Sequence, residues 1–209
     1  MEKELLIKKL IRNGYLLSEE VIDAMKEIPR ELFVPGNEKK QAYADIPLKI
    51  GYGQTISAPH MVAIMTEALD LKKDSKVMEI GTGTGYHAAV VAKVAEEGHI
   101  YTVERIMELA EKAKRNFKKL GIKNVTVVVS DGSAGLPEYS PFDRIYVTCA
   151  APSVPPQLVK QLSEHGKMLL PVGRTFCDLI LIEKNEEMLQ KNLGACSFVP
   201  MIGRKGYNG

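Results

Sequence analysis

The sequence predicts an α/β fold, in which a doubly wound, mostly parallel sheet follows a set of N-terminal helices. Beyond Lys76, short apolar runs alternate with helical segments of about 10 to 15 residues, the pattern of consecutive βαβ units. Glycines cluster directly after the first apolar run, where a strand would meet its helix. Before Lys76 the apolar residues recur at helical spacing instead, which predicts helices packed on the sheet.

The N-terminal part predicts three helices and one long irregular segment. Residues 3–13 form the first helix, closed by Gly14, and residues 18–27 form the second, with Ser18 as a candidate N-cap. Residues 29–59 lose periodicity and gather Pro and Gly, so we expect a long loop. In a compact domain such a loop is usually either functional or a sign that its secondary structure has been missed. Residues 61–69 are helical again.

The second part predicts the sheet, and each of its crossovers should be right-handed. We expect strands at 76–80, 99–103, 125–129, 143–148 and 167–172, helices at 86–95, 106–120 and 155–162, and extended segments at 178–184 and 196–199.

Composition excludes several classes of protein. The 209 residues include 28 basic and 26 acidic side chains, for a net charge of +2, which is too even for a dedicated nucleic-acid binder. Cys149, Cys177 and Cys196 are odd in number and widely spaced, so we expect neither a disulfide framework nor a metal site. A reducing compartment, the cytoplasm, fits such cysteines best.

No segment of the sequence predicts membrane insertion. The N-terminal residues lack the apolar run of a signal peptide, and a packed helix is favoured there over an amphipathic helix on a membrane surface. The longest uncharged stretch, residues 50–66, carries Gly, Gln, Ser, Pro and His, which a membrane span would not.

The glycine turn after the first strand predicts a ligand site. Gly81, Gly83 and Gly85 let a backbone approach a ligand closely, and the following helix offers free N–H groups. A dinucleotide fingerprint would need glycine where Tyr86 stands. With Glu79 ahead of it, the turn resembles the first motif of Rossmann-like S-adenosylmethionine-dependent methyltransferases. The alternative is a tight strand–helix turn without a ligand.

Two further signals follow the next two strands. Glu104 ends the second strand, where a carboxylate accepts hydrogen bonds from ribose hydroxyls in nucleotide-binding sheets. Asp131 and Gly132 follow the third strand, where methyltransferases of this fold contact adenine, although Asp-Gly is also an ordinary turn. All three signals lie at carboxyl ends of neighbouring strands, which is where open α/β sheets bind ligands.

The residues after the fourth strand indicate which chemical group accepts the methyl group, because they lack the side chains that would activate an amine. Thr148 and Cys149 occupy the position at which amino methyltransferases carry Asp or Asn, followed by two prolines and an aromatic residue. Cys149 is interpreted as a small buried side chain rather than a nucleophile. No strong general base is evident. A carboxylate acceptor needs none, because it is ionised at neutral pH with a pKa of about 4, so carboxyl methylation is favoured.

The segment before the predicted helix at residues 61–69 carries the most specific resemblance. Its plain structural interpretation is that Ser57 caps that helix with Pro59 in the first turn, which leaves the preceding Gly-Gln-Thr-Ile unexplained. Over residues 16–199 the chain closely resembles protein-L-isoaspartate O-methyltransferases. The segments that carry the resemblance are GQTISAPHM, MEIGTGTGYHAAVVAKV, TVER, DGSAGLPEYSPFDRIYVTCAAPSVPPQLVKQL and LLPVG.

This resemblance implies a reaction and a set of site residues. S-adenosyl-L-methionine would methylate the free carboxylate of isoaspartyl residues in damaged peptides and proteins, leaving S-adenosyl-L-homocysteine and initiating repair. Ser57 would be the active-site residue, with Thr55 and Ile56 beside it to hold the carboxylate and cofactor. The implied cofactor contacts are Thr55, Ile56, His60, Glu79, Gly81, Gly83, Glu104, Asp131 and Gly132.

The resemblance also implies one methyltransferase domain over 1–209, with 1–75 as helices and substrate loop and 76–209 as the cofactor-binding sheet. It further implies a variant order of the final strands. The C-terminal FVPMIG departs from relatives that close the site there with polar residues, so no site residue is assigned to it.

Other functions stay open at this point. They are a methyltransferase of the same fold acting on RNA or a small molecule, a nicotinamide-dependent oxidoreductase, which Tyr86 opposes, and a non-catalytic module that binds the nucleoside cofactor.

Overall fold

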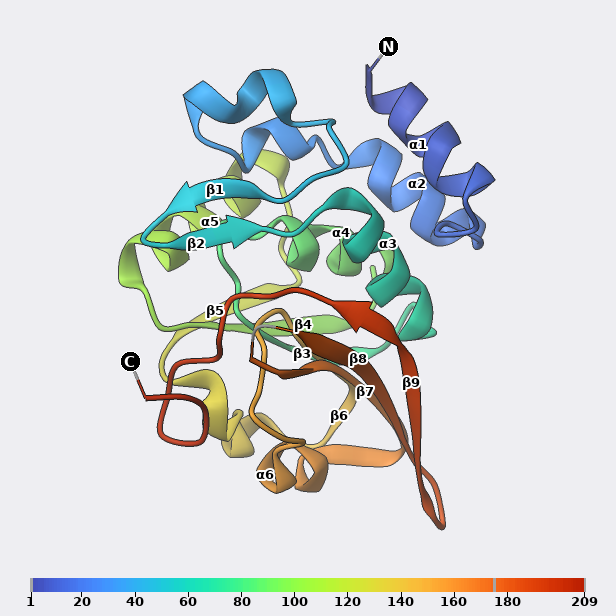
Figure 1. Cartoon of the computed structure of the whole chain (residues 1–209), viewed down its shortest axis with the longest axis vertical. Coiled ribbons are helices and arrows are strands. Elements are labelled where there is room, and N and C mark those ends of the chain that lie inside the picture. Colours follow the sequence, from blue (N-terminus) through green and yellow to red (C-terminus); the bar gives the residue numbers. More distant parts are fainter. Residues whose placement is uncertain (1, 175, 209) are drawn as a thin grey trace.

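A seven-stranded sheet of order β5-β4-β3-β6-β7-β8-β9 forms the centre of the protein (Figure 1). The computed structural model describes residues 2–174 and 176–208. The strands are β3 (Lys76–Ile80), β4 (His99–Glu104), β5 (Val125–Val129), β6 (Phe142–Val147), β7 (Leu162–Gly173), β8 (Cys177–Lys184) and β9 (Met188–Cys196). Strands β3 to β7 pair in parallel, and β8 and β9 add to the edge antiparallel, which confirms the predicted fold class.

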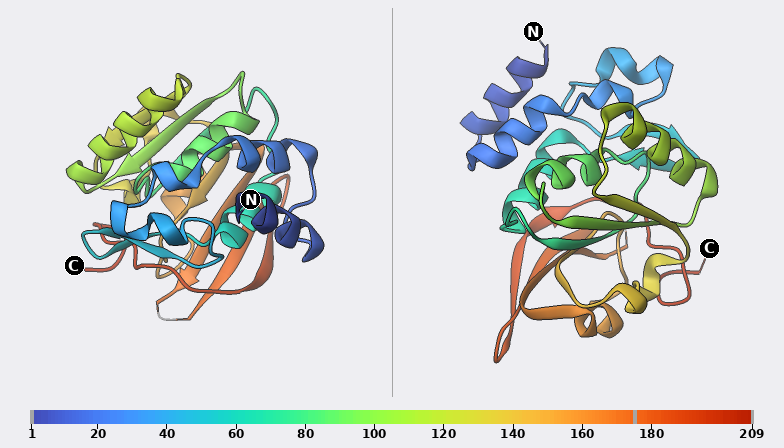
Figure 2. Two further views of the ribbon diagram at one scale, coloured as in Figure 1. Left: turned by 90° about the horizontal axis from the view of Figure 1, so that it is seen from above. Right: turned by 180° about the vertical axis from the view of Figure 1, so that it is seen from behind.

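Helices cover both faces of this sheet. The described α-helices are α1 (Glu2–Arg12), α2 (Glu19–Glu27), α3 (Pro59–Ala68), α4 (Tyr86–Val94), α5 (Met107–Leu120) and α6 (Pro156–Lys160). Helices α1 to α5 lie over one face and α6 lies over the other, as the views in Figure 2 show. Each face has its own apolar core, one around Leu10, Val90 and Tyr146 and the other around Met78, Phe142 and Leu158.

Residues 29–59, expected as a loop, are largely ordered into short elements. They contain two 3-10 helices, η1 (Arg30–Leu32) and η2 (Gly36–Gln41), and a hairpin of β1 (Leu48–Gly51) with β2 (Gln54–Ile56). The hairpin turns through Tyr52 and Gly53, which both have positive φ, 54° and 69°. Two-residue hairpin turns require this conformation, but Tyr-Gly is not one of the pairs by which sequence analysis finds them. The expectation of a long loop was therefore wrong.

Strand β9 is the other element that the sequence did not reveal. Only residues 196–199 were expected to be extended, whereas the strand runs over 188–196 and lies mostly exposed at the sheet edge. Its polar, exposed residues do not alternate with apolar ones, so the periodicity that predicts a strand is missing. Pairing with β8 alone decides its conformation.

Ser18 stands at the N-cap position of α2, as expected, but its side chain does not cap the helix. Its hydroxyl instead donates to Glu67 Oε2 at 2.9 Å, and the other carboxylate oxygen accepts from the N–H groups of Leu17 and Ser18. These bonds tie α2 to α3, which carries Glu67.

Candidate functional site

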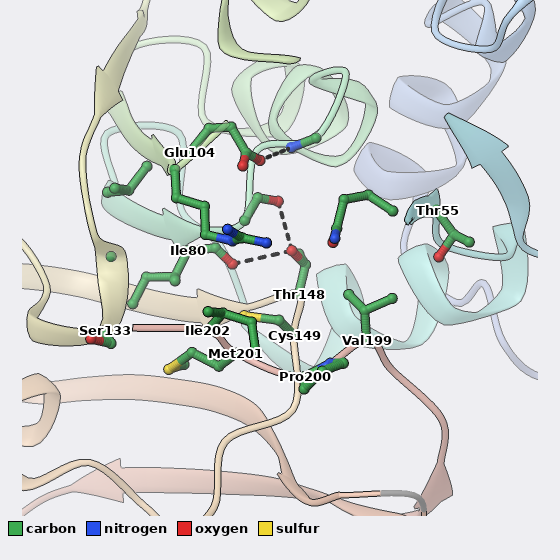
Figure 3. Close-up of a pocket in the computed structure, with 16 residues that line it drawn as sticks. Thr55, Ile80, Glu104, Ser133, Thr148, Cys149, Val199, Pro200, Met201 and Ile202 are labelled. Atoms are coloured by element: carbon green, nitrogen blue, oxygen red, sulfur yellow. Dashed lines mark hydrogen bonds between the residues drawn. The ribbon is translucent and has the colours of Figure 1, made fainter. Parts of the chain in front are cut away.

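A cleft opens at the carboxyl ends of β3, β4 and β6, beneath the β1–β2 hairpin (Figure 3). The space between its walls, including the part open to solvent, is about 560 Å³. Its walls are Gln54, Thr55, Ile80, Gly81, Gly83, Val103, Glu104, Arg105, Gly132, Ser133, Thr148, Cys149, Val199, Pro200, Met201 and Ile202. Five of the expected site residues, Thr55, Gly81, Gly83, Glu104 and Gly132, are among these walls, so the structure brings the separate sequence signals together.

Glycine is required at the first position of the turn. Gly81 has a φ of +98°, and a Cβ there would lie 2.3 Å from Thr148 Oγ1. That hydroxyl donates to Gly81 O at 2.6 Å, so the threonine that follows β6 fastens the turn that follows β3. Because both the backbone angle and the space exclude a side chain, the turn presents bare backbone to the cleft.

Glu104 is held in a fixed orientation at the wall of the cleft. Its Oε2 accepts from Gly83 N at 2.8 Å and its Oε1 accepts from Ile106 N at 2.9 Å. The residue is 7% exposed. Each carboxylate oxygen has a second lone pair, which leaves Glu104 able to accept from hydroxyl groups of a ligand in the cleft.

Of the Asp-Gly pair after β5, only the glycine lines the cleft. The Asp131 carboxylate accepts from Ser133 N at 2.9 Å and from Arg204 N at 2.8 Å, which directs it into the chain rather than toward the described walls of the cleft. Burial opposes ionisation of Asp131, but the hydrogen bonds from Arg204 and Ser133 outweigh it and hold the pKa below its usual value.

A second, inner cavity adjoins the cleft and shares Thr55, Gly81, Gly83 and Thr148 with it. Glu79 lies in its wall and is completely buried. Burial raises the pKa of Glu79 to about 8, although the Thr102 hydroxyl donates to Oε2 and opposes the shift. Glu79 Oε1 makes no hydrogen bond of standard geometry with a described residue, although the buried Tyr146 hydroxyl lies close enough to lower the pKa of Glu79. A buried oxygen in this state needs a donor, which a ligand in the cavity can supply.

The segment with Thr55, Ile56 and Ser57 forms the opposite wall of the inner cavity. Helix α3 has Ala58 as its N-cap and Pro59 at its first turn, so the expected capping by Ser57 is wrong while the place of Pro59 is confirmed. Within the described chain the Ser57 hydroxyl has no hydrogen-bond partner, and the residue is half-buried. It is therefore free to bind a ligand.

His60 follows Ser57 by three residues but lines neither cavity in the described structure. Its backbone N–H donates to Asp45 Oδ1 at 2.9 Å, and its Nδ1 lies 2.9 Å from the same oxygen. The Asp45 side chain thus binds the first turn of α3, the helix that begins just after Ser57.

The walls also include residues that the sequence analysis did not assign. Thr148, Ser133 and Arg105 each follow a strand, so their place after a strand end could have found them. The C-terminal strap, which we define as residues 197–202, gives no such signal. It reaches the cleft because Ala150 N donates to Val199 O and Met201 N donates to Ala150 O, both at 2.8 Å.

Across 2–174 and 176–208, no group of three or more His, Cys, Asp or Glu side chains is placed to hold a metal ion. No helix in that part of the chain is both long and apolar enough to cross a bilayer.

Comparison with known proteins gives a consistent result. The sequence model of the family described as Protein-L-isoaspartate(D-aspartate) O-methyltransferase matches residues 1–206. The chain is 51% identical to the protein-L-isoaspartate O-methyltransferase of Methanococcus aeolicus, covering 98% of this chain and 96% of that protein. It is 50% identical to the one from Methanothermobacter thermautotrophicus, covering 99% and 97%.

Solved structures agree with these sequence matches. A protein-L-isoaspartate O-methyltransferase superimposes with a TM-score of 0.89 at 35% identity, over 98% of this chain and 67% of that chain. A beta-aspartate methyltransferase from Plasmodium falciparum, in complex with S-adenosyl-L-homocysteine, superimposes with a TM-score of 0.83 at 25% identity, over 96% and 98%.

Proposed function

Because the chain belongs to the protein-L-isoaspartate(D-aspartate) O-methyltransferase family, we propose which of its own residues carry out that family's reaction. The protein is an S-adenosyl-L-methionine-dependent enzyme that methylates the free carboxylate of isoaspartyl residues in damaged proteins. The observation that supports the residue assignment is the shared wall at Thr55, where the cleft with the glycine turn meets the inner cavity with Ser57.

The cleft fits the methyl donor. Glu104 would accept from the ribose hydroxyls, and Gly132 would lie beside the adenine. The bare backbone at Gly81 and Gly83 would let the donor lie close to the turn. Glu79 Oε1, buried without a hydrogen bond of standard geometry to a described residue, would accept from the donor's amino group. When bound, S-adenosyl-L-methionine supplies the methyl group on a positively charged sulfur.

We assign indirect roles to two residues that the resemblance named as cofactor contacts. Asp131 holds Ser133 and the backbone at Arg204, and thereby shapes the wall beside Gly132. His60 and Asp45 fix the start of α3, and thereby the segment that contains Ser57. Ile56 is nearly buried and packs the hairpin against the inner cavity.

The acceptor chemistry needs orientation rather than proton transfer. An isoaspartyl carboxylate is already ionised at neutral pH, so direct displacement requires no general base. We propose that the unpaired Ser57 hydroxyl donates to one carboxylate oxygen and so aims the other at the methyl group. Thr55 stands next to both cavities and would contact donor and acceptor together.

Substrate choice follows from geometry, because aspartyl and isoaspartyl carboxylates are similar nucleophiles. The two differ by one methylene moved between the main chain and the branch. A site that pairs with the peptide backbone leaves polar groups unpaired when that methylene is misplaced, which discriminates more strongly than an apolar pocket. The segment 29–59 and the C-terminal strap are the proposed walls for this pairing.

The test is a methyl-transfer assay on paired peptides that differ only in the isoaspartyl linkage. We expect the isoaspartyl peptide to react at least about 100-fold faster than its aspartyl twin, with tolerance of varied flanking side chains. Comparable rates on the two peptides would overturn the proposed basis of selectivity. Methylation of RNA or an amine in place of either peptide would favour the same-fold alternative.

We propose in addition that residues 1–209 act as one methyltransferase domain, since α2 packs against α4 and the hairpin of residues 48–56 overlies the cleft. A cytoplasmic location is supported by three free thiols in the described chain. Protein rather than nucleic acid or membrane as partner is supported by the balance of 28 basic and 26 acidic residues.

A further inference from the structure

Two cysteines lie opposite one another on the edge strands of the sheet. Cys177 begins β8 and Cys196 ends β9, and the two are register partners in the antiparallel ladder. Both are free in the described structure. Directly opposed residues project from the same face with Cα atoms about 4.5–5.5 Å apart, within the range of about 4.4–6.8 Å that a disulfide spans.

We propose that Cys177 and Cys196 are a modification site that forms a reversible cross-strand disulfide when the protein meets a small disulfide oxidant. The chemistry is thiol–disulfide exchange. The Cys196 thiolate attacks the oxidant RSSR, forming a mixed disulfide and releasing RS⁻. The Cys177 thiolate then attacks the Cys196 sulfur and releases the second RS⁻. Both released thiolates take up the two protons lost by the cysteines, so RSSR is reduced by two electrons to 2 RSH.

Burial determines the order and the speed of these steps. Cys177 is only 3% exposed, whereas Cys196 is half-buried, so an oxidant reaches Cys196 first. Burial raises the pKa of Cys196 to about 12, with Cys177 and Asp178 adding to the shift, and it also raises the pKa of Cys177. Because the thiolate is the attacking species, exchange should be slow at neutral pH and faster in alkali.

The bond would constrain the C-terminal strap, which starts at the residue after Cys196. Figure 1 shows the chain leaving β9 and passing to the C-terminal turn, and residues 199–202 of this stretch line the cleft. At the other cysteine, Gly173 is the register partner of Cys177 across β7 and β8, and its carbonyl accepts from the Tyr207 hydroxyl at 2.8 Å. A disulfide would therefore tie the residue just before the strap to the β7–β8 edge, which also binds Tyr207 beyond the strap's other end.

The test is oxidation of the full-length enzyme with glutathione disulfide at about pH 8.5 and pH 7, followed by mapping of the bonds. Trypsin cuts after Arg174, Lys184, Lys191 and Arg204, so the bond would link peptide 175–184 to peptide 192–204. We expect this linked pair, a mass loss of about 2 Da, faster formation at the higher pH, and reversal by dithiothreitol. Cys149 should stay alkylatable after unfolding.

Two cysteine variants test the disulfide, and amide hydrogen exchange tests its effect on the strap. Cys196→Ser and Cys177→Ser should each yield no internal bond, while circular dichroism shows that both variants are folded. Oxidised wild type should exchange amide hydrogens more slowly than the reduced enzyme in the peptide 192–204. A folded wild type that keeps both thiols, or that carries only glutathione adducts, overturns the site. A linked pair with unchanged amide exchange overturns the constraint on the strap.

Discussion

Replacing Ser57 with alanine should reduce turnover without reducing stability. Ser57 neither caps α3 nor has a hydrogen-bond partner in the described chain, so its removal breaks no bond of the folded protein. A substitution of this kind changes the free energy of unfolding by no more than about 0.5 kcal/mol. A helix cap would instead have been worth about 1 kcal/mol.

The expected loss of activity follows from the bond proposed to the acceptor. A hydrogen bond to a charged group contributes about 1.5–3 kcal/mol. Losing it should lower kcat/KM on an isoaspartyl peptide by about 10- to 150-fold. Affinity for S-adenosyl-L-homocysteine should change little if Ser57 contacts the acceptor rather than the cofactor.

Ser18→Ala provides the opposite control. The Ser18 hydroxyl donates to Glu67 at 2.9 Å between α2 and α3, away from both cavities. This variant should lose roughly 1.5 kcal/mol of stability, or about 3–6 °C in Tm, with turnover kept. Thermal melts, peptide methylation and calorimetry with S-adenosyl-L-homocysteine on the same preparations separate the outcomes. If Ser57→Ala melts lower by several degrees and keeps its kcat/KM, the acceptor role is refuted.

Three further substitutions test the proposed binding site for S-adenosyl-L-methionine. Glu104→Gln should weaken binding of S-adenosyl-L-homocysteine about tenfold or more, because a charged acceptor is lost; calorimetric affinity equal to wild type would contradict this. Gly81→Ala should lower the free energy of unfolding, measured by urea denaturation, much more than Gly121→Ala does. Both glycines have positive φ, but a Cβ at Gly81 would lie 2.3 Å from Thr148, whereas no described atom lies within 4 Å of a Cβ at Gly121. Equal losses of stability in the two variants would mean that backbone strain alone matters. For Glu79, burial raises the folded-state pKa to about 8 from 4.5, so the donor-free protein should lose stability as pH rises from about 4.5 through about 8. Glu79→Gln should flatten that decline in pH-dependent melts, and an unchanged slope would assign it to other groups.

The sequence by itself determined the parallel part of the sheet and the turn at its centre. The apolar run at residues 76–80 predicts a strand because burial on both faces of the sheet removes the polar alternation. Gly81 and Glu104 could be assigned because Gly81 directly follows a strand and Glu104 ends one, and parallel strands bring their carboxyl ends to one edge. These are short-range patterns, and the right-handed crossover fixes how they assemble.

Only the tertiary structure decided which of the candidate residues line the cleft. Asp131 follows its strand as expected, but a backbone N–H at Arg204, distant in sequence, takes its carboxylate away from the cleft. The strap reaches the cleft through bonds between Ala150 and residues 199 and 201, and β9 forms only because β8 lies beside it. None of these segments has an apolar period or a turn signature that demands its conformation. Their free energy comes from hydrogen bonds to distant partners, which local sequence does not specify.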